Sequence, residues 1–197
     1  MTIEYTSPYG ISSFEDFNKL NKAFVDKTEF INVIDKLDSP YPVLLRPRRF
    51  GKTTFVQMLL CFYDISFKDK YDEIFKGTKI LEMNLPSHNS YHVIKFDFSG
   101  ISGTNVESLI TNFNQKVSVG INDFLIRYPD FEFSNDYTGR DPANFIDEFF
   151  KTFARYSKSK SLYILIDEYD NFANDVLSND RDLFKTITQS NGFLKDF

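Results

Sequence analysis

The sequence predicts an α/β fold in which helices cover both faces of a parallel sheet. Apolar runs of strand length alternate along the chain with longer stretches whose apolar residues recur at helical spacing, and this alternation is typical of parallel sheets. One apolar run, at 41–45, leads through a basic loop into an apolar helix. Another, at 161–166, is followed directly by the acidic sequence D-E-Y-D. Because open parallel sheets bind ligands at strand ends, both points are candidate sites.

The first elements surround the basic loop. Asp26 and Glu29 have the spacing of a capping box at the start of a helix. One stripe of that helix would consist of Phe30, Ile31, Ile34 and Leu37. Residues 41–45 (Y-P-V-L-L) then predict a short strand that a proline opens. Residues 53–63 are apolar on nearly every face, so they predict a helix buried in a larger domain.

The middle of the chain continues the alternation. Between about 68 and 89 the sequence is polar, with Gly77 and Pro86 as breakers, and predicts a short helix and loops. Residues 93–98 alternate in parity and predict a second strand. A long amphipathic helix is then indicated by the spacing of Val106, Leu109, Ile110, Phe113, Val117, Ile121, Phe124 and Leu125.

The last third repeats the same order. Residues 128–140 are typical of a loop, and Asp141 followed by Pro142 predicts the start of another helix. Its buried face would consist of Phe145, Ile146, Phe149, Phe150 and Phe153. The strand at 161–166 follows, and a last helix is expected from about Asp180. That helix has Leu183, Phe184, Ile187 and Leu194 as its apolar residues.

The basic loop carries half of a phosphate-binding motif. Residues 46–54 read R-P-R-R-F-G-K-T-T, which keeps the end of G-x-x-x-x-G-K-[ST] but has Arg46 where the first glycine belongs. In the full motif, backbone N–H groups surround phosphate oxygens, the lysine reaches the terminal phosphates and the hydroxyl holds magnesium. The helix that follows directs its free N–H groups and positive dipole end at the anion.

The acids after the strand at 161–166 could complete a nucleotide site. In an enzyme with a phosphate-binding loop, Asp167 would hold magnesium, and Glu168 would position and deprotonate the attacking water. The alternative is that D-E-Y-D only opens a solvated loop or caps a helix. The presence of Lys52 and Thr53 in the same chain favours the first interpretation.

A third segment, A-F-V-D-K-T-E-F-I at 23–31, extends the pattern. Together with R-P-R-R-F-G-K-T and L-I-D-E-Y-D, it resembles the AAA-ATPase-like family of P-loop proteins. Members commonly begin with V-D-K-T and carry R-P-R-R-F-G-K-[ST], so the resemblance makes Arg46 a family trait. It implies a three-layer, AAA-like P-loop NTPase sheet, with the V-D-K-T segment near the nucleotide base. In related proteins a nuclease-like domain of the PD-(D/E)XK type often follows.

The motifs and the resemblance together imply an ATPase with Walker A and Walker B motifs and with ATP and Mg²⁺ as cofactors. The catalytic residues would be Lys52 and Glu168, and magnesium would be held by Thr53 and Asp167. The cofactor-binding residues would be Arg48, Arg49, Phe50, Gly51, Lys52, Thr53 and Thr54. ATP would be hydrolysed at the γ-phosphate if this site is complete.

Length and composition agree with one domain over residues 1–197, in which residues 1–38 form a helical lead-in. In AAA-type domains, which the chain resembles, the strand after the acidic one carries a sensor residue and inserts beside the P-loop strand. The chain stops at Phe197 before such a strand, so we expect a domain that is incomplete at its C-terminus. The alternative is a rearranged sheet in which the acidic strand pairs directly with the P-loop strand.

Composition narrows the class of protein further. The net charge of −5 argues against a nucleic-acid surface along the whole chain. A single cysteine excludes an internal disulfide and favours a reducing compartment. The sequence shows no signal peptide and no apolar stretch near the roughly 20 residues of a membrane span. We therefore expect a cytoplasmic protein whose partner is a nucleotide, with no membrane partner.

Two other function classes stay open. One is a degenerate, non-hydrolysing P-loop interaction module with a protein partner, which absent turnover in an intact fold would identify. The other is a nucleic-acid-binding domain led by the basic run at 46–52. Binding of that kind would fall steeply with added salt and would not respond to magnesium and ATP. The acidic overall charge makes this class third, with nucleic acid a partner only indirectly.

Overall fold

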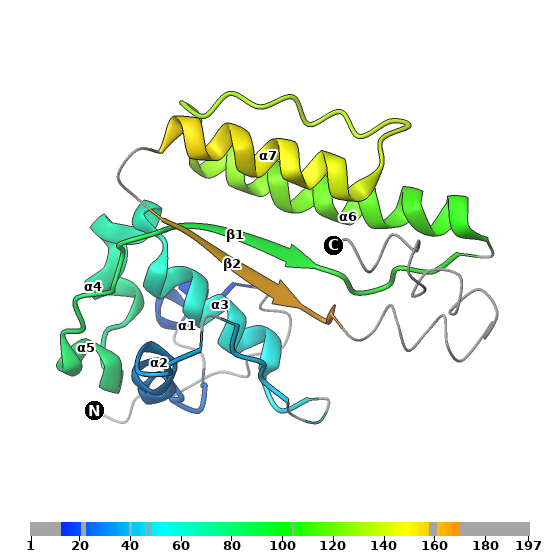
Figure 1. Cartoon of the computed structure of the whole chain (residues 1–197). Helices are drawn as coiled ribbons and strands as arrows, with labels where there is room; N and C mark the ends of the chain where they lie inside the picture. The colour runs from blue at the N-terminus through cyan, green and yellow to red at the C-terminus, as the bar shows by residue number, and fades with distance from the viewer. Residues whose placement is uncertain are drawn as a thin grey trace. The chain divides into compact units, whose positions relative to one another are not determined.

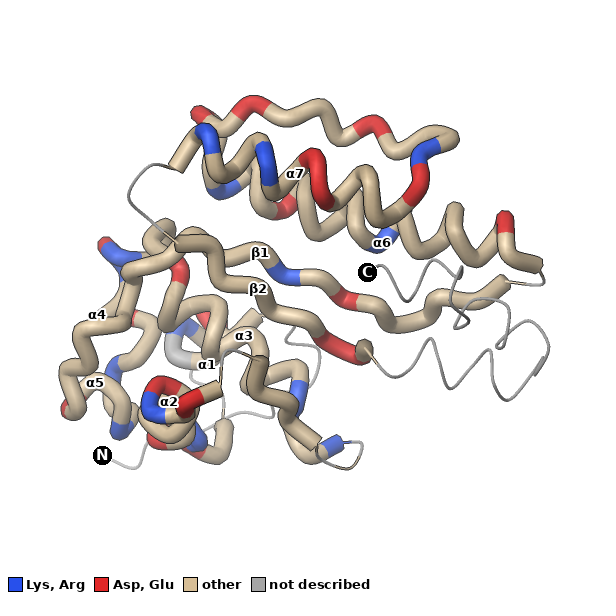
Figure 2. The backbone as a smooth tube through the Cα atoms, in the orientation of Figure 1, with Lys and Arg blue, Asp and Glu red and all other residues tan. Residues whose placement is uncertain are grey.

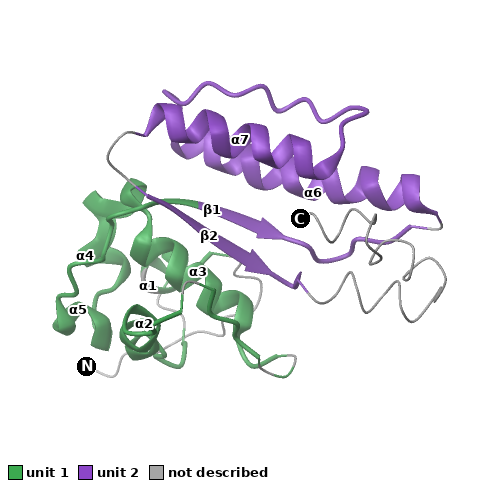
Figure 3. Cartoon of the chain, in the orientation of Figure 1, with its two compact units in different colours: residues 1–93 green, residues 94–197 purple. Residues whose placement is uncertain are grey.

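The computed structural model describes residues 13–20, 23–39, 41–45, 47, 49–103, 105–157 and 161–169. These residues form a mixed structure of helices and two strands (Figure 1). The chain divides into two compact units, residues 1–93 and residues 94–197 (Figure 3). The expected last helix from Asp180 lies outside the described residues.

Unit 1 consists of helices and irregular chain. Its elements are α1 (Glu15–Lys19), α2 (Glu29–Asp35), α3 (Lys52–Tyr63), the 3-10 helix η1 (Ile65–Lys70), α4 (Tyr71–Ile74) and α5 (Lys79–Met83). The predicted helix at 53–63 is confirmed, and it begins one residue earlier. The polar stretch at 68–89 is confirmed as short helices and loops. Helix α3 is the longest of these elements and forms much of the core of the unit.

Helix α3 is held by aromatic contacts and by a capped C-terminal end. The ring of Phe62 is fully buried, and its centroid lies 6.1 Å from that of Phe75 in an edge-on arrangement. Cys61, the only cysteine of the sequence, is 1% exposed. The side-chain amide of Asn89 donates to the carbonyl oxygens of Cys61 and Asp64 at 3.3 and 2.7 Å. Asn89 thereby satisfies carbonyl groups that the end of a helix leaves without partners.

The predicted start of α2 is wrong in its details. The residue that caps the helix is Thr28, not Asp26, and its side chain makes no capping bond to the first turn. Of the predicted apolar stripe, Ile31 is fully buried, whereas Phe30 and Leu37 are 48% and 47% exposed. The carboxylate of Asp26 is instead used by another helix of unit 1, as described below.

The predicted strand at 41–45 is not present in the structure. These five residues are described, form no strand and are all exposed. An apolar sequence shows that a segment suits a sheet, but tertiary structure decides whether the segment joins one. A ladder between residues near 44 and 164 is likewise not found among the described residues.

Unit 2 contains a two-stranded parallel sheet. Strands β1 (His92–Asp97, which begins just before the unit boundary) and β2 (Leu162–Asp167) are neighbours and run in the same direction (Figure 1). The crossover between them contains α6 (Val106–Arg127) and α7 (Pro142–Tyr156), which lie side by side. Parallel strands need such a crossover because a short turn cannot join them. All four predicted elements are confirmed in type.

The core of unit 2 is rich in phenylalanine. Phe124 of α6 contacts Phe149 and Phe153 of α7, with ring centroids 5.3 and 5.9 Å apart. The segment at 128–140 has no regular structure, as predicted. Its Phe131 nevertheless packs on Phe124 and is only 3% exposed. The loop therefore contributes to the core, which its polar composition did not indicate.

Helix α7 begins as the sequence predicts. The side chain of Asp141 accepts a hydrogen bond from the N–H of Asn144 at 3.1 Å, and Pro142 occupies the first turn. Phe145, Ile146, Phe149 and Phe153 are buried, as expected, and Phe150 is partly exposed. The capping aspartate and the first-turn proline thus fix the end of the loop at 128–140.

Helix α6 and strand β1 approach each other closely at Gly120. A Cβ atom at this position would lie 2.6 Å from the carbonyl oxygen of Lys95 and 2.6 Å from Cδ1 of Phe96. The carbonyl belongs to the backbone of the sheet, so it cannot move without disturbing β1. Glycine is therefore required here by the space available and not by a positive φ.

We expect Gly120→Ala to destabilise the protein by about 1 to 2 kcal/mol, since overpacking of this kind outweighs the better helix propensity of alanine. Thermal unfolding followed by circular dichroism measures the change. The matched control is Asn122→Ala on the exposed side of the same helix, which should be neutral or slightly stabilising. A melting temperature of Gly120→Ala at or above that of the wild type would contradict the close contact.

Candidate functional site

The start of α3 has the geometry of an anion-binding helix end. Gly51 precedes the helix with φ of 77° and ψ of 29°, a left-handed conformation that glycine adopts without strain. Its carbonyl accepts the N–H of Phe55 at 2.9 Å and so closes the first turn. Because glycine has no side chain, it cannot cap the N–H groups of Lys52, Thr53 and Thr54 that open the helix. These groups can therefore bind an anion.

The rest of the basic loop is partly described. Arg49 has φ of 67°, an uncommon conformation for a residue with a side chain. Arg49, Phe50 and Thr53 are exposed, and Lys52 is partly buried. Arg46 and Arg48 lie outside the described residues. Two left-handed residues within three positions indicate a backbone that the loop holds in an unusual shape.

Lys27 of the V-D-K-T segment reaches this loop. Its Nζ donates a hydrogen bond to the carbonyl oxygen of Phe50 at 2.9 Å. The same Nζ would lie 3.6 Å from a Cβ atom placed on Gly51. A residue 23 positions earlier in the sequence therefore lies beside the turn that starts α3.

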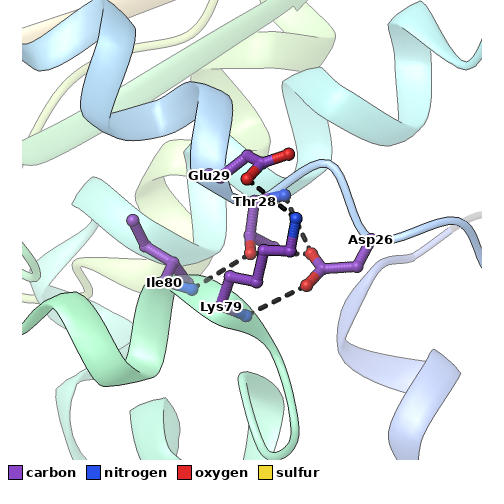
Figure 4. Close-up of polar contacts among 5 residues, drawn as sticks. All are labelled: Asp26, Thr28, Glu29, Lys79 and Ile80. Atoms are coloured by element: carbon purple, nitrogen blue, oxygen red, sulfur yellow. Dashed lines mark hydrogen bonds and ion pairs between the residues drawn. The ribbon is translucent and has the colours of Figure 1, made fainter.

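The residues on both sides of Lys27 are fastened to the start of α5 (Figure 4). Oδ2 of Asp26 accepts the N–H of Lys79 at 3.0 Å, and Oδ1 accepts the hydroxyl and the N–H of Thr28 at 2.7 and 2.9 Å. The Thr28 hydroxyl also accepts the N–H of Ile80 at 3.2 Å. We call these four residues the Asp26 turn. It satisfies two N–H groups of the first turn of α5 and uses a threonine that is fully buried.

Two charge effects accompany the Asp26 turn. Partial burial raises the pKa of Asp26, but the N–H groups of Lys79 and Thr28 and the Thr28 hydroxyl outweigh it, so the pKa lies below its usual value. Lys79 also forms an ion pair with Glu29 at 2.8 Å, and the pair raises the pKa of Lys79. The ion pair is exposed and contributes little to stability. The hydrogen bonds of the Asp26 carboxylate therefore contribute more to stability than this ion pair does.

The acidic motif, which begins with Asp167 and Glu168, lies at the end of β2 in unit 2 (Figure 2). Asp167 is the last residue of β2 and is 4% exposed. Its carbonyl accepts the N–H of Phe98, and its Oδ1 accepts the N–H of Glu168, both at 3.1 Å. Glu168 has φ of 55° and is partly exposed. The strand thus ends in a buried carboxylate next to a more accessible one.

Asp97 ends the neighbouring strand β1, so it lies at the same edge of the sheet as Asp167. Its Oδ1 accepts the N–H of Ser99 at 2.9 Å. Partial burial raises the pKa of Asp97, but the Ser99 N–H and hydroxyl, with Lys116 and Lys95 nearby, lower it below its usual value overall. Asp97 is therefore charged and bound to its own chain, which matches a local structural role.

The structure brings together some of the predicted site residues. Arg49 to Gly51 lead directly into the first residues of α3, Lys52 to Thr54, in unit 1, whereas Asp167 and Glu168 adjoin each other in unit 2. Within the described ranges, no cluster of three or more His, Cys, Asp or Glu residues could hold a metal ion. Magnesium binding by Thr53 and Asp167 therefore stays a prediction. The same holds for the catalytic roles of Lys52 and Glu168.

The sequence did not predict the contacts that Lys27 and Lys79 make. The V-D-K-T segment carried the family resemblance, but no pattern in it indicated that Lys27 would contact the basic loop or that Asp26 would bind the start of α5. Both contacts join residues more than 20 positions apart. A short-range pattern cannot reveal such contacts. Packing of this segment near a nucleotide base stays a prediction.

A helix that starts at a left-handed glycine and a basic loop, together with a parallel strand that ends in two acids, is the combination expected of a nucleotide-binding P-loop protein. The comparison with protein families agrees. The chain belongs to the predicted AAA-ATPase family, whose model matches residues 8–197. Searches of curated proteins and of solved structures found no match. Across the described part of the chain, no helix has both the length and the apolar character to cross a membrane.

The Asp26 turn predicts an acid-dependent loss of stability. Because its folded pKa is lowered, Asp26 stabilises the fold fully above its unfolded pKa of about 3.9, and this contribution is lost as pH falls through the folded value. We expect Asp26→Asn to cost about 1 to 2 kcal/mol at pH 7. The difference from wild type should shrink below about pH 4.

Thermal unfolding of both proteins between pH 3 and pH 7 checks this expectation. The control is Asp69→Asn, which changes an exposed aspartate of η1 in the same unit. A stability difference for Asp26→Asn that stays constant across this pH range would show that the carboxylate charge does not contribute.

Proposed function

We propose that the chain is a magnesium-dependent ATP-binding domain with an AAA-like, three-layer P-loop fold, and that it hydrolyses ATP. One observation carries the proposal. Helix α3 starts at left-handed Gly51 and continues directly with Lys52 and Thr53, so uncapped N–H groups, an ammonium and a hydroxyl gather at one helix end. This combination is the one that a magnesium-bound polyphosphate requires.

Each part of the site would have a separate role. N–H groups from Arg49 to Thr54 would surround phosphate oxygens, and Lys52 would neutralise charge on the β- and γ-phosphates. Thr53 and Asp167 would order magnesium. Glu168 would orient and deprotonate the attacking water, a contribution of about 10²- to 10⁴-fold in rate for a well-placed base.

Two structural features support these assignments. Glu168 holds a left-handed backbone conformation, and such strain is concentrated at functional sites. The apolar side chains Ile164 and Ile166 of β2 are 43% and 42% exposed. A sheet face of this kind requires a covering layer, which supports the three-layer architecture. The family to which the chain belongs is itself described as a predicted AAA-ATPase.

Binding of ATP tests the loop assignment. We expect Lys52→Ala to weaken magnesium-ATP binding by at least about tenfold, because it removes a charge-assisted contact to phosphate. Isothermal titration calorimetry measures the affinity directly. The matched control is Lys68→Ala, which removes an exposed lysine of η1 in the same unit. Unchanged binding by Lys52→Ala would remove the P-loop assignment.

Turnover tests the role of the acid. We expect Glu168→Gln to bind ATP as tightly as wild type but to lose about a hundredfold or more in hydrolysis rate, because the amide cannot accept a proton. Release of inorganic phosphate under saturating ATP measures the rate. A wild type that binds ATP without turnover would identify the non-hydrolysing interaction module. Salt-sensitive binding of nucleic acid that ignores magnesium-ATP would identify the third class.

A further inference from the structure

Lys27 has a contact that the proposed roles do not use. Its Nζ donates to the carbonyl oxygen of Phe50, one residue before the glycine that starts α3. An ammonium has three donors. Among the described residues the Phe50 carbonyl is the one hydrogen-bond acceptor of Lys27. The contact thus joins a charged side chain to the backbone of the loop at its last turn before the helix.

This contact fixes the orientation of one peptide group. In a trans peptide the C=O and the following N–H point in opposite directions, and no cis peptide occurs in the described chain. When Lys27 holds the Phe50 carbonyl on its own side, the N–H of Gly51 points to the other side. No described residue accepts that N–H. A ligand on the side away from Lys27 would face this N–H.

The position of Lys27 is itself fixed. Asp26 and Thr28, its two neighbours, are bound to the start of α5 by hydrogen bonds of 3.0 and 3.2 Å. The backbone on both sides of Lys27 therefore cannot shift without breaking these bonds. Lys27 is partly buried, which further limits the freedom of its side chain. The loop therefore contacts a side chain whose two sequence neighbours are hydrogen-bonded to α5.

We propose that Lys27 is a positioning residue for phosphate binding, which turns the Phe50–Gly51 peptide so that the Gly51 N–H faces the phosphates. The inference rests on the proposed function, because it assigns a role within the same loop. It also accounts for a departure in the sequence. Arg46 replaces the glycine that normally allows the loop its tight turn. Lys27, from another segment, stabilises the loop by its hydrogen bond to the Phe50 carbonyl.

The sequence allows this peptide to be observed alone. Phe50–Gly51 is the only Phe-Gly pair in the chain. Protein labelled with ¹³C at phenylalanine carbonyls and with ¹⁵N at glycine therefore gives one carbonyl-to-amide correlation in an NMR spectrum. The carbonyl shift reports the hydrogen bond from Lys27. The amide shift reports contact with inorganic tripolyphosphate, which is a probe without a base or a sugar.

Three variants complete the experiment. Lys27→Met removes the donor and keeps the unbranched side chain to within one atom of its length, Lys27→Arg restores a charged donor, and Lys68→Met is the control at an exposed lysine. In Lys27→Met we expect a shifted Phe50 carbonyl before any ligand is added. We expect at least about a tenfold loss of affinity for tripolyphosphate and for ATP. Lys27→Arg should recover most of this affinity, and Lys68→Met should match wild type.

Several results would overturn the inference. An unchanged Phe50 carbonyl or unchanged affinity in Lys27→Met, when Lys52→Ala has lost binding, would refute the role of Lys27 and leave the P-loop assignment intact. If Lys27→Met does not fold, the wild-type protein decides, since a Gly51 amide that ignores bound tripolyphosphate contradicts the proposal. A wild type that binds neither ATP nor tripolyphosphate would refute the proposed function and this inference together.

Discussion

A helix can offer its first N–H groups to a ligand only if no side chain has already taken them. In this protein the residue before α3 is a glycine in a left-handed conformation, so the chain turns sharply and leaves these groups uncapped. The other features of unit 1 support that turn. Lys27 holds the peptide before it, and the Asp26 turn holds Lys27. The conformation of the loop therefore depends on residues that are distant from it in the sequence.

Most elements of the fold could be predicted from the sequence because they depend on local patterns. The 3.6-residue period of α6 and the capping aspartate and proline of α7 involve neighbouring residues only. The strand predicted at 41–45 failed for the opposite reason. Its apolar residues suit a sheet, but tertiary structure decides whether such a segment becomes a strand. The buried Phe131 shows the same limit within a loop of polar composition.

In the candidate site, too, features that depend on neighbouring residues could be predicted, and features that depend on distant contacts could not. The Gly-Lys-Thr sequence and the acids at the end of β2 could be found because each motif is contiguous. The backbone at Gly51 and Glu168 is left-handed, which suits such motifs. The contact of Lys27 with the loop could not be found, since it joins residues 23 positions apart. The expected capping role of Asp26 was wrong because α2 begins after Thr28, and the Asp26 carboxylate binds Thr28 and the start of α5 instead.

The burial of Cys61 has a practical consequence. It is the only thiol in the chain, and it lies in α3, the helix that begins directly after Gly51. A thiol reagent can modify the native protein only when that helix opens, so the rate of modification measures its local opening free energy. Any ligand that binds only the closed helix slows the reaction in proportion to its occupancy. The native thiol therefore reports the local stability of α3 without an engineered label.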